Sequence, residues 1–359
     1  MYHRLNGQAL NRPGSGQVQC DVCQRRCVVN EGRRGFCRTR LNRGGKFYSL
    51  TYGRVASIST NPIEKKPVFH FYPGSRWLSL GSLGCNFLCP GCQNWEIAHD
   101  RVGAYGNTPL QEETYEFLSP EESVQLARER ECLGISWTFN EPTLWLEYTL
   151  EGARLARGQG LFTNYVTNGF MTEEALDTIG PYLDVFRVDI KGFSRETYHR
   201  VAHIKDFMGI LRVTERARHR WGMHVEVVTN VTPGFNDSEE ELKGIAVWIR
   251  DSLGRDIPWH VTRFYPYLHL SHLPPTPIQK LERVREMGLE VGLDYVYIGN
   301  VPGHPGENTY CPGCGRLLIE RFVYEITLHE MEGGKCLGCG YQLAGRFGAV
   351  CKDRPITER

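Results

Sequence analysis

Three cysteines in the middle of the chain have the spacing most able to support catalysis. Cys85, Cys89 and Cys92 form a CxxxCxxC pattern in the stretch 84–97. Three thiolates cannot complete a tetrahedral structural zinc site without a fourth ligand. They can bind three irons of a [4Fe-4S] cluster and leave the fourth iron open. The amino and carboxylate groups of S-adenosylmethionine (SAM) can occupy that iron, and one-electron transfer then cleaves a carbon–sulfur bond to give a 5'-deoxyadenosyl radical.

A regular alternation of strands and helices must position this loop. The first expected strand ends just before Cys85, and the later strands are separated by helices whose starts carry N-cap residues. The expected strands are residues 76–83, 134–139, 161–166, 184–190, 224–231, 259–265 and 295–300. The expected helix starts are at Ser119, Thr172, Asp237 and Thr276. Such alternation predicts an α/β fold built on a parallel sheet.

Polar side chains follow several of the expected strands, at the carboxyl ends where parallel sheets place their chemistry. They are Glu141, Asn168, Asp189, Lys191, Asn230 and Arg263. Each could instead be an ordinary polar loop residue. Asp189 and Lys191 point to the same side of a strand because they are two residues apart. A charged pair at a buried strand end needs a partner, which is either a charged ligand or each other.

The motifs together resemble the radical SAM superfamily. More narrowly, the chain resembles the radical SAM enzyme of the AmmeMemoRadiSam system, which is itself similar to glycyl-radical-enzyme activases. The stretches that carry the resemblance include CDVCQRRCVVNEGRRGFC (20–37), GCNFLCPGCQNWEI (84–97), TFNEPT (138–143), VTNGF (166–170), VDIKG (188–192) and NTYCPGCG (308–315). The resemblance implies a partial (β/α)6 barrel that binds a [4Fe-4S] cluster and SAM.

The same resemblance implies roles for individual residues. Glu141 would meet the amino group of the methionine moiety, where a carboxylate neutralises the ammonium. Asn168 would bind the ribose or the carboxylate. Lys191 would pair with the methionine carboxylate, and Asp189 would face the sulfonium or a monovalent cation.

Two further positions, Asn230 and Arg263, are weaker candidates for contacts to SAM. The sequence departs from the family pattern at Gly91, where many members carry an aromatic residue just before the third cysteine. The aromatic contact to the adenine would then be lost, or would come from Phe87 or Trp95.

The two outer groups of cysteines have the spacing of metal sites. The C-terminal group resembles a zinc ribbon with two CxxC knuckles, for which zinc is the first choice and a rubredoxin-like iron the alternative. The N-terminal group could bind structural zinc or a second iron–sulfur cluster that relays electrons, or could be free thiols. The C-terminal ligands would be Cys311, Cys314, Cys336 and Cys339, and the N-terminal ligands Cys20, Cys23, Cys27 and Cys37. Cys132 and Cys351 stand apart and are expected to be ordinary buried or surface thiols.

The composition limits the other functions. The net charge is only +1, from 42 basic and 41 acidic residues, so nucleic-acid binding by bulk electrostatics is not expected. No apolar run is long enough to cross a membrane. The first residues contain no apolar signal segment, which suggests a cytoplasmic protein, and in that compartment clustered cysteines are more often metal ligands than disulfides.

Three units are expected: a cysteine-rich region over 1–75, a radical SAM barrel over 76–303 and a zinc-ribbon-like domain over 304–359. The function expected is reductive cleavage of SAM followed by hydrogen abstraction from an unidentified substrate. The alternatives are an activase of a glycyl-radical partner protein and a non-catalytic, zinc-rich scaffold or nucleic-acid-binding protein. The enzyme would need a reductant of the flavodoxin or ferredoxin type, and the resemblance adds two partner proteins of the same system.

A choice between substrates depends on the mouth of the barrel. An activase needs an open mouth, to admit a glycine of a large partner. We expect the linker 299–310 to cross the mouth and the ribbon and the loop 265–277 to close it, which favours a smaller substrate.

Overall fold

The protein is described from a computed structural model, over residues 3–4, 16–100 and 115–348. Its centre is an eight-stranded sheet, in which seven neighbouring strands run parallel and only β7 pairs antiparallel, with β8. In spatial order the strands are β15 (Val296–Gly299), β14 (Trp259–Arg263), β13 (His224–Val231), β12 (Val185–Asp189), β11 (Phe162–Thr167), β10 (Gly134–Trp137), β8 (Arg76–Gly81) and β7 (Ser57–Pro62). The seven parallel strands coincide with the seven expected from the sequence.

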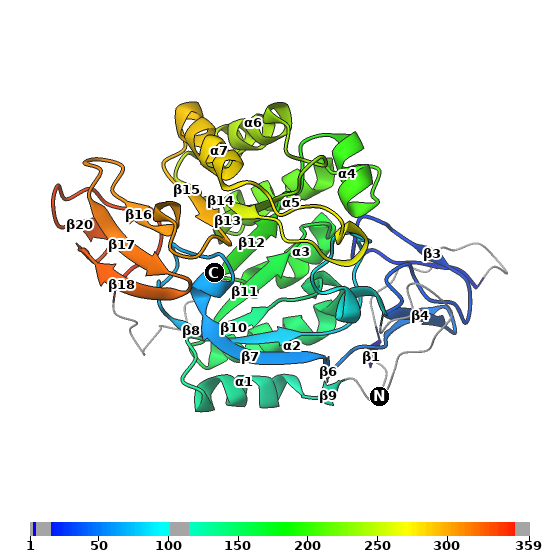
Figure 1. Ribbon diagram of the computed structural model, residues 1–359. Helices are drawn as coiled ribbons and strands as arrows, with labels where there is room; N and C mark the ends of the chain where they lie inside the picture. Colours follow the sequence, from blue (N-terminus) through cyan, green and yellow to red (C-terminus); the bar gives the residue numbers. More distant parts are fainter. Residues whose placement is uncertain (1–2, 5–15, 101–114, 349–359) are drawn as a thin grey trace.

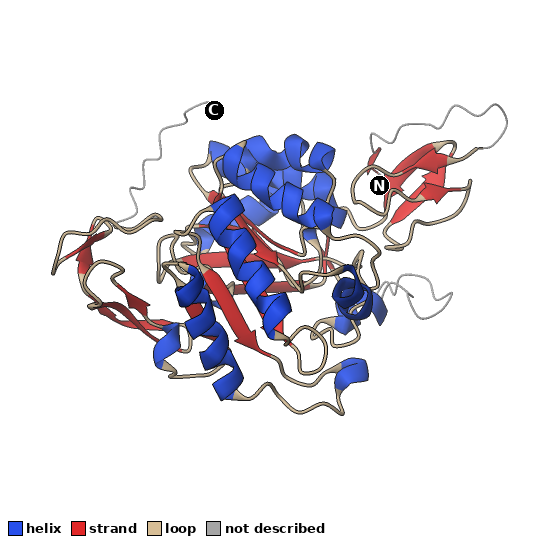
Figure 2. Ribbon diagram, turned by 90° about the horizontal axis from the view of Figure 1, so that it is seen from above, coloured by secondary structure: helices blue, strands red, loops and turns tan. Residues whose placement is uncertain are grey.

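Helices connect the parallel strands and pack beside them, as Figures 1 and 2 show. They are α1 (Pro120–Glu129), α2 (Leu146–Gly158), α3 (Glu173–Ile179), α4 (Arg195–Ala202), α5 (Met208–His219), α6 (Glu239–Trp248) and α7 (Ile278–Val291). This mixed α/β architecture with a central parallel sheet agrees with the predicted fold class. Closure of the sheet into a partial (β/α)6 barrel and division of the chain into three domains stay predictions.

The helix starts follow local capping chemistry. Ser119 caps α1, and Glu122 completes the capping box by accepting a hydrogen bond from the Ser119 amide. Thr172 caps α3. The expected start at Asp237 is wrong by one residue, because Ser238 caps α6.

Short strands flank the central sheet at opposite ends of the molecule (Figure 1). The N-terminal strands are β1 (His3–Arg4), β2 (Val18–Gln19), β3 (Val28–Val29), β4 (Arg40–Arg43), β5 (Lys46–Ser49) and β6 (Arg54–Val55), which pairs with β9 (Glu116–Phe117). The C-terminal strands are β16 (Thr309–Tyr310), β17 (Leu317–Phe322), β18 (Glu325–His329), β19 (Met331–Glu332) and β20 (Lys335–Cys336). The N-terminal segment is fixed to the connection between β11 and α3, where the Thr172 amide donates to the carbonyl of Val22 at 3.2 Å.

The C-terminal segment packs against the amino ends of the last strands, away from the cysteine loop that follows β8. Its apolar core, which includes Leu318 and Ile319, is shared with Phe69, Tyr295 and Tyr297. The segment 299–310 turns back along β15, so that the hydroxyls of Tyr297 and Thr309 lie 2.9 Å apart. The expectation that the linker and the ribbon close the mouth is therefore wrong. The apolar contacts with Tyr295 and Tyr297 hold the ribbon at the opposite end, and the linker runs from the carboxyl end of β15 back to it.

Candidate active site

Hydrogen bonds from neighbouring strands hold the cysteine loop, residues 82–97. Asn140 follows β10 and bridges the start of the loop: its side chain accepts from the Ser82 amide at 2.9 Å and donates to the Gly84 carbonyl at 3.0 Å. From the other end of the loop, the Asn94 side chain donates to the Phe139 carbonyl, just beyond β10, at 2.7 Å. The loop is therefore fixed at the carboxyl ends of β8 and β10, where the strand pattern placed it.

Cys85 lies against the end of β11. The Asn168 amide nitrogen Nδ2 is 3.8 Å from the Cys85 sulfur and donates to Asn86 Oδ1 at 2.7 Å. The backbone amide of Phe87 also points at this sulfur, at 3.4 Å. Burial raises the pKa of the Cys85 thiol well above its usual range, so metal binding must displace a proton here.

Glu141 is buried and its carboxylate accepts four hydrogen bonds from the chain itself. Oε1 accepts from the amide and hydroxyl of Thr143 and from the hydroxyl of Thr167, and Oε2 accepts from the Asn168 amide at 2.8 Å. Burial raises its pKa, while these donors oppose the shift. The carboxylate therefore ties the end of β10 to the end of β11, and contact with a methionine ammonium stays a prediction.

Asp189 and Lys191 lie at the end of β12 and contact each other, which is the simpler of the two alternatives drawn from their spacing. Lys191 Nζ is 3.1 Å from Asp189 Oδ2, and the buried Arg187 holds the other carboxylate oxygen. Although burial opposes the charged forms, the two cations lower the pKa of Asp189, and Asp189 raises the pKa of Lys191. The sequence did not single out Arg187, because a buried arginine within an apolar strand has no distinguishing spacing.

One cavity brings predicted residues from three strand ends together. Its volume is about 80 Å³, and its lining includes Cys89, Lys191 and Asn230. Asn230 also donates to the Thr262 hydroxyl at 3.2 Å. Arg263 does not line this cavity, and its Nε donates instead to the Thr276 carbonyl at 2.9 Å.

Gly91 explains how the loop that follows β14 approaches the cysteines. A Cβ at this position would lie 3.0 Å from a Leu270 carbon and 3.2 Å from a Phe264 ring carbon. The His269 amide donates to the Pro90 carbonyl at 3.0 Å. Phe264 thus occupies the space that an aromatic side chain at position 91 would need.

Phe87 and Trp95 differ in their access to this region. The Phe87 ring packs against that of Phe170 and is only 1% exposed. Trp95 is half-buried. A role of either ring toward an adenine stays a prediction.

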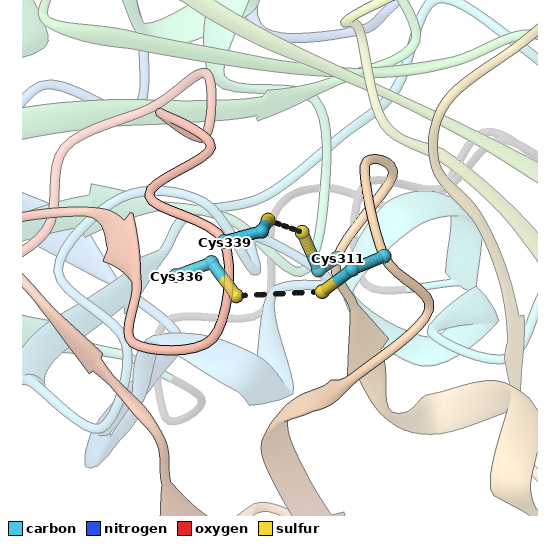
Figure 3. A group of neighbouring side chains, drawn as sticks. Cys311, Cys336 and Cys339 are labelled. Carbon is cyan, nitrogen blue, oxygen red and sulfur yellow. Dashed lines mark hydrogen bonds between the residues drawn. The ribbon is translucent and has the colours of Figure 1, made fainter.

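The four C-terminal cysteines form a compact group (Figure 3). Their sulfur atoms all lie within 4.8 Å of one another, with Cys311 and Cys339 separated by 3.5 Å and Cys314 and Cys336 by 3.7 Å. Four thiolates around one zinc ion stand about 4 Å apart, since each zinc–sulfur bond is about 2.3 Å. The group therefore fits a single tetrahedral ion.

The remaining cysteines lie elsewhere. Cys20, Cys23, Cys27 and Cys37 line a cavity of their own beside the cysteine loop. Cys132 is 6% exposed and belongs to the apolar core, in agreement with the expectation for an isolated thiol. Cys351 lies outside the described residues.

Residues 80–249 match the family described as the Radical SAM superfamily. The chain is 42% identical to an uncharacterized protein of Methanocaldococcus jannaschii, MJ0808, over 91% of this chain and 95% of that protein. The chain belongs to the radical SAM superfamily. Two solved structures resemble this radical SAM chain in fold. They are Streptococcus suis SuiB bound to S-adenosylmethionine (TM-score 0.48, 11% identity, 70% of this chain and 56% of that chain) and a Sphaerobacter thermophilus radical SAM methyltransferase (0.47, 16%, 64% and 67%).

Membership of this superfamily of enzymes implies a [4Fe-4S] cluster and SAM, and the side chains at the site have the chemistry that both need. The three thiols sit on one loop at the carboxyl ends of the strands, and their sulfurs are not drawn together as the C-terminal four are. Lys191 supplies a cation beside Cys89. No helix in the described part of the chain is both long and apolar enough to cross a membrane.

Sequence reasoning missed the residues that hold the loop. Asn86 and Asn94 lie within it, and Asn140 lies just beyond β10, next to Glu141. In the sequence, each of these asparagines lies within two residues of a predicted site residue. That proximity does not reveal which backbone groups the side-chain amide will contact.

Proposed function

We propose that this radical SAM enzyme binds its cluster through Cys85, Cys89 and Cys92 and reductively cleaves SAM to abstract hydrogen from a substrate. When bound, the cluster supplies one electron that splits SAM into methionine and a 5'-deoxyadenosyl radical. The chain's own residues position the reactants. Asn140 and Asn94 fix the loop, and Asn168 orients Cys85.

The cavity shared by Cys89, Lys191 and Asn230 carries this proposal. Lys191 lies where it can exchange its contact with Asp189 for the carboxylate of the methionine moiety, an ion pair of the same type. The cavity, at about 80 Å³, is smaller than the several hundred cubic ångströms that a ligand of this size fills. Binding of SAM therefore requires movement of its walls, which include Phe264 and Leu270.

Anaerobic reconstitution with iron and sulfide tests the proposal. The reduced protein is expected to convert SAM to 5'-deoxyadenosine and methionine, measured by chromatography. Cys89→Ala should abolish the conversion, because it removes one of the three ligands. Cys132→Ala, which changes a buried thiol away from the site, should retain it. Normal turnover by Cys89→Ala would refute the assignment.

A second candidate function is that of an activase, which abstracts hydrogen from a glycine of a partner protein. The position of the C-terminal segment favours it, because that segment packs at the amino end of β15 and does not itself cover the carboxyl ends of the strands. The two partner proteins of the AmmeMemoRadiSam system are the first to test. A glycyl radical signal in electron paramagnetic resonance (EPR) spectra of either partner, dependent on SAM and on this enzyme, would support the activase function.

Two further components complete the proposal. The C-terminal cysteines would bind zinc as a structural ion, which their compact sulfur group supports. A protein of the flavodoxin or ferredoxin type would supply the electrons that each cleavage consumes. Metal analysis of the purified protein separates zinc from iron at the C-terminal group.

A further inference from the structure

The N-terminal cysteines surround a cavity next to the radical SAM loop. Two short strands, β2 and β3, place them there, and the Cys20 amide donates to the Cys27 carbonyl at 2.9 Å. The volume of this cavity is about 10 Å³, so an occupant larger than a single ion requires its walls to move apart. Its lining contains all four thiols of the N-terminal group, Cys20, Cys23, Cys27 and Cys37. Four convergent thiols around one space are a metal site by their chemistry.

The N-terminal sulfurs are less compact than the C-terminal ones. At the C-terminal site all four sulfur atoms lie within 4.8 Å of one another. Among the described residues no other cysteines form such a group, and this includes any three of the N-terminal four. The sulfurs of Cys85, Cys89 and Cys92, to which the superfamily assigns a [4Fe-4S] cluster, also form no such compact group. A cluster of four irons holds its thiolates farther apart than one zinc ion does. The N-terminal four therefore resemble the cluster loop more than the ribbon.

Two buried N–H donors on the cavity lining support a sulfide-containing occupant. Arg40 is 1% exposed; its terminal nitrogens bond Glu147 and the Leu144 carbonyl, but its Nε has no partner. Asn86 is fully buried, and its Nδ2 also lacks a partner. Buried donors are rarely left unpaired in folded proteins. The sulfurs of an iron–sulfur cluster accept such hydrogen bonds, which help to set its potential.

Asn86 connects this cavity to the radical SAM loop. It lines the cavity and directly follows Cys85. Arg25, from the N-terminal segment, donates to the Asn86 carbonyl at 2.7 Å. On the other side, Cys27 also borders a surface groove of about 910 Å³. An occupant of the cavity would thus lie between the surface and the cysteine loop, the position that an electron relay requires.

We propose that Cys20, Cys23, Cys27 and Cys37 bind a second [4Fe-4S] cluster beside the radical SAM loop. This site is independent of SAM cleavage, and its test needs no turnover. The variant in which Cys85, Cys89 and Cys92 are all alanine removes the first cluster and leaves the N-terminal site intact. The control is Cys132→Ala, which alters neither site.

Anaerobic reconstitution is followed by iron, zinc and acid-labile sulfide analysis. The triple variant should stay brown, with about four irons and four labile sulfides per chain, and give a [4Fe-4S] signal in EPR spectra after reduction. A rubredoxin-like iron at the C-terminal site would add iron but no labile sulfide. Labile sulfide in the triple variant would therefore come from a cluster and not from that site. A folded, colourless triple variant without labile sulfide would overturn the proposal.

The wild-type protein provides a second measurement that does not depend on the folding of the variant. About eight irons and eight labile sulfides per chain support two clusters, and the Cys132→Ala control should match this count. About four of each, with zinc filling the N-terminal site, would overturn the proposal. Absence of SAM cleavage in a protein with eight irons would refute the proposed function and leave the second cluster established.

Discussion

Lys191 is a cation whose contacts indicate its role toward a ligand. Its Nζ is 3.1 Å from Asp189, while Arg187 holds the same carboxylate from the other side. Asp189 therefore has two cationic partners and can lose one. Lys191 also lines the cavity with Cys89, so its charge is available to an anionic group there. The arginine and the aspartate would then remain paired when SAM binds.

Replacing Lys191 by methionine keeps the length of the side chain and removes its charge. We expect the dissociation constant for SAM to rise about 10–100-fold, because a hydrogen bond to a charged group contributes about 1.5–3 kcal/mol. Equilibrium dialysis with the reconstituted protein measures this change. Lys205→Met is the matched control at an exposed position and should bind as the wild type does. Equal affinities for the Lys191 variant and the wild type would exclude a contact with the ligand.

At the scale of elements, two loops meet at the carboxyl ends of the strands. The loop over 265–277 donates a hydrogen bond from His269 to Pro90 and packs Leu270 over Gly91. Thr276 secures the far end of that loop: its hydroxyl donates to the Val231 carbonyl at 2.6 Å and accepts from the Phe264 amide at 2.9 Å. A side chain at position 91 is therefore excluded by the loop over 265–277.

Gly91→Tyr restores the aromatic residue that many superfamily members carry, but this chain has no room for it. We expect the variant to displace the loop over 265–277, because a Cβ alone would lie 3.0 Å from Leu270. Limited chymotrypsin digestion should cleave faster after the exposed Tyr267, whereas Tyr265 precedes a proline and is not cleaved. Gly158→Tyr introduces the same side chain where nothing lies within 4 Å and should leave the digestion rate unchanged. An unchanged digestion rate for Gly91→Tyr would contradict this packing.

The elements were the most predictable part of the molecule. All seven parallel strands follow from apolar runs separated by turn and capping residues, which are local properties of the sequence. Thr276 shows where local reasoning fails. It resembles a helix cap, but α7 begins after Pro277 without a side-chain cap, because the Thr276 hydroxyl is engaged by Val231.

The candidate site was predictable in residue types and less so in contacts. Cys89, Lys191 and Asn230 come together because parallel strands end at one edge. The four donors to the Glu141 carboxylate, and the contact of Arg187 with Asp189, depend on distances between strands that a single sequence does not reveal.

At the scale of the whole molecule, a buried polar network joins the C-terminal segment to the amino ends of the strands. The Glu226 carboxylate accepts from His224 Nε2 at 2.8 Å, from His260 Nε2 at 2.6 Å and from the backbone amides of Phe69 and His70. The His70 ring lies 2.7 Å from the hydroxyl of Tyr297 and 2.8 Å from a carbonyl of the C-terminal segment. Sequence reasoning could not assemble this network, because its members are far apart along the chain.

The network predicts that acid weakens the fold. Burial lowers the pKa of His70 to about 4, although Glu226 opposes the shift. As the pH falls below about 6.5, the unfolded chain takes up a proton that the folded chain refuses, so stability is lost between about pH 6.5 and 4. We expect the free energy of unfolding to fall by on the order of 2 kcal/mol from this group.

Denaturant unfolding at several pH values measures this dependence. His70→Gln should reduce the slope of the unfolding free energy against pH between 6.5 and 4.5. His272→Gln, which removes an exposed histidine, should keep the wild-type slope. A His70→Gln protein with an unaltered slope would show that other groups cause the acid sensitivity.

Metal removal acts on the C-terminal segment by a different route. Cys311→Ser should lose one zinc ion per chain and unfold this segment at a lower temperature, because the ion organises strands with a small core. Zinc analysis and calorimetry measure both effects. Cys132→Ser is the control and should keep its zinc. A Cys311→Ser protein with full zinc content would exclude these cysteines as the ligands.

The compact four-thiol ribbon lies at the far end of the sheet from the loop that would touch air-sensitive iron. A preparation handled in oxygen is therefore expected to keep its fold, its melting temperature and the zinc proposed for this group while the cysteine loop has lost its cluster. Good solubility and a sharp thermal transition would therefore not show that such a sample can still cleave SAM.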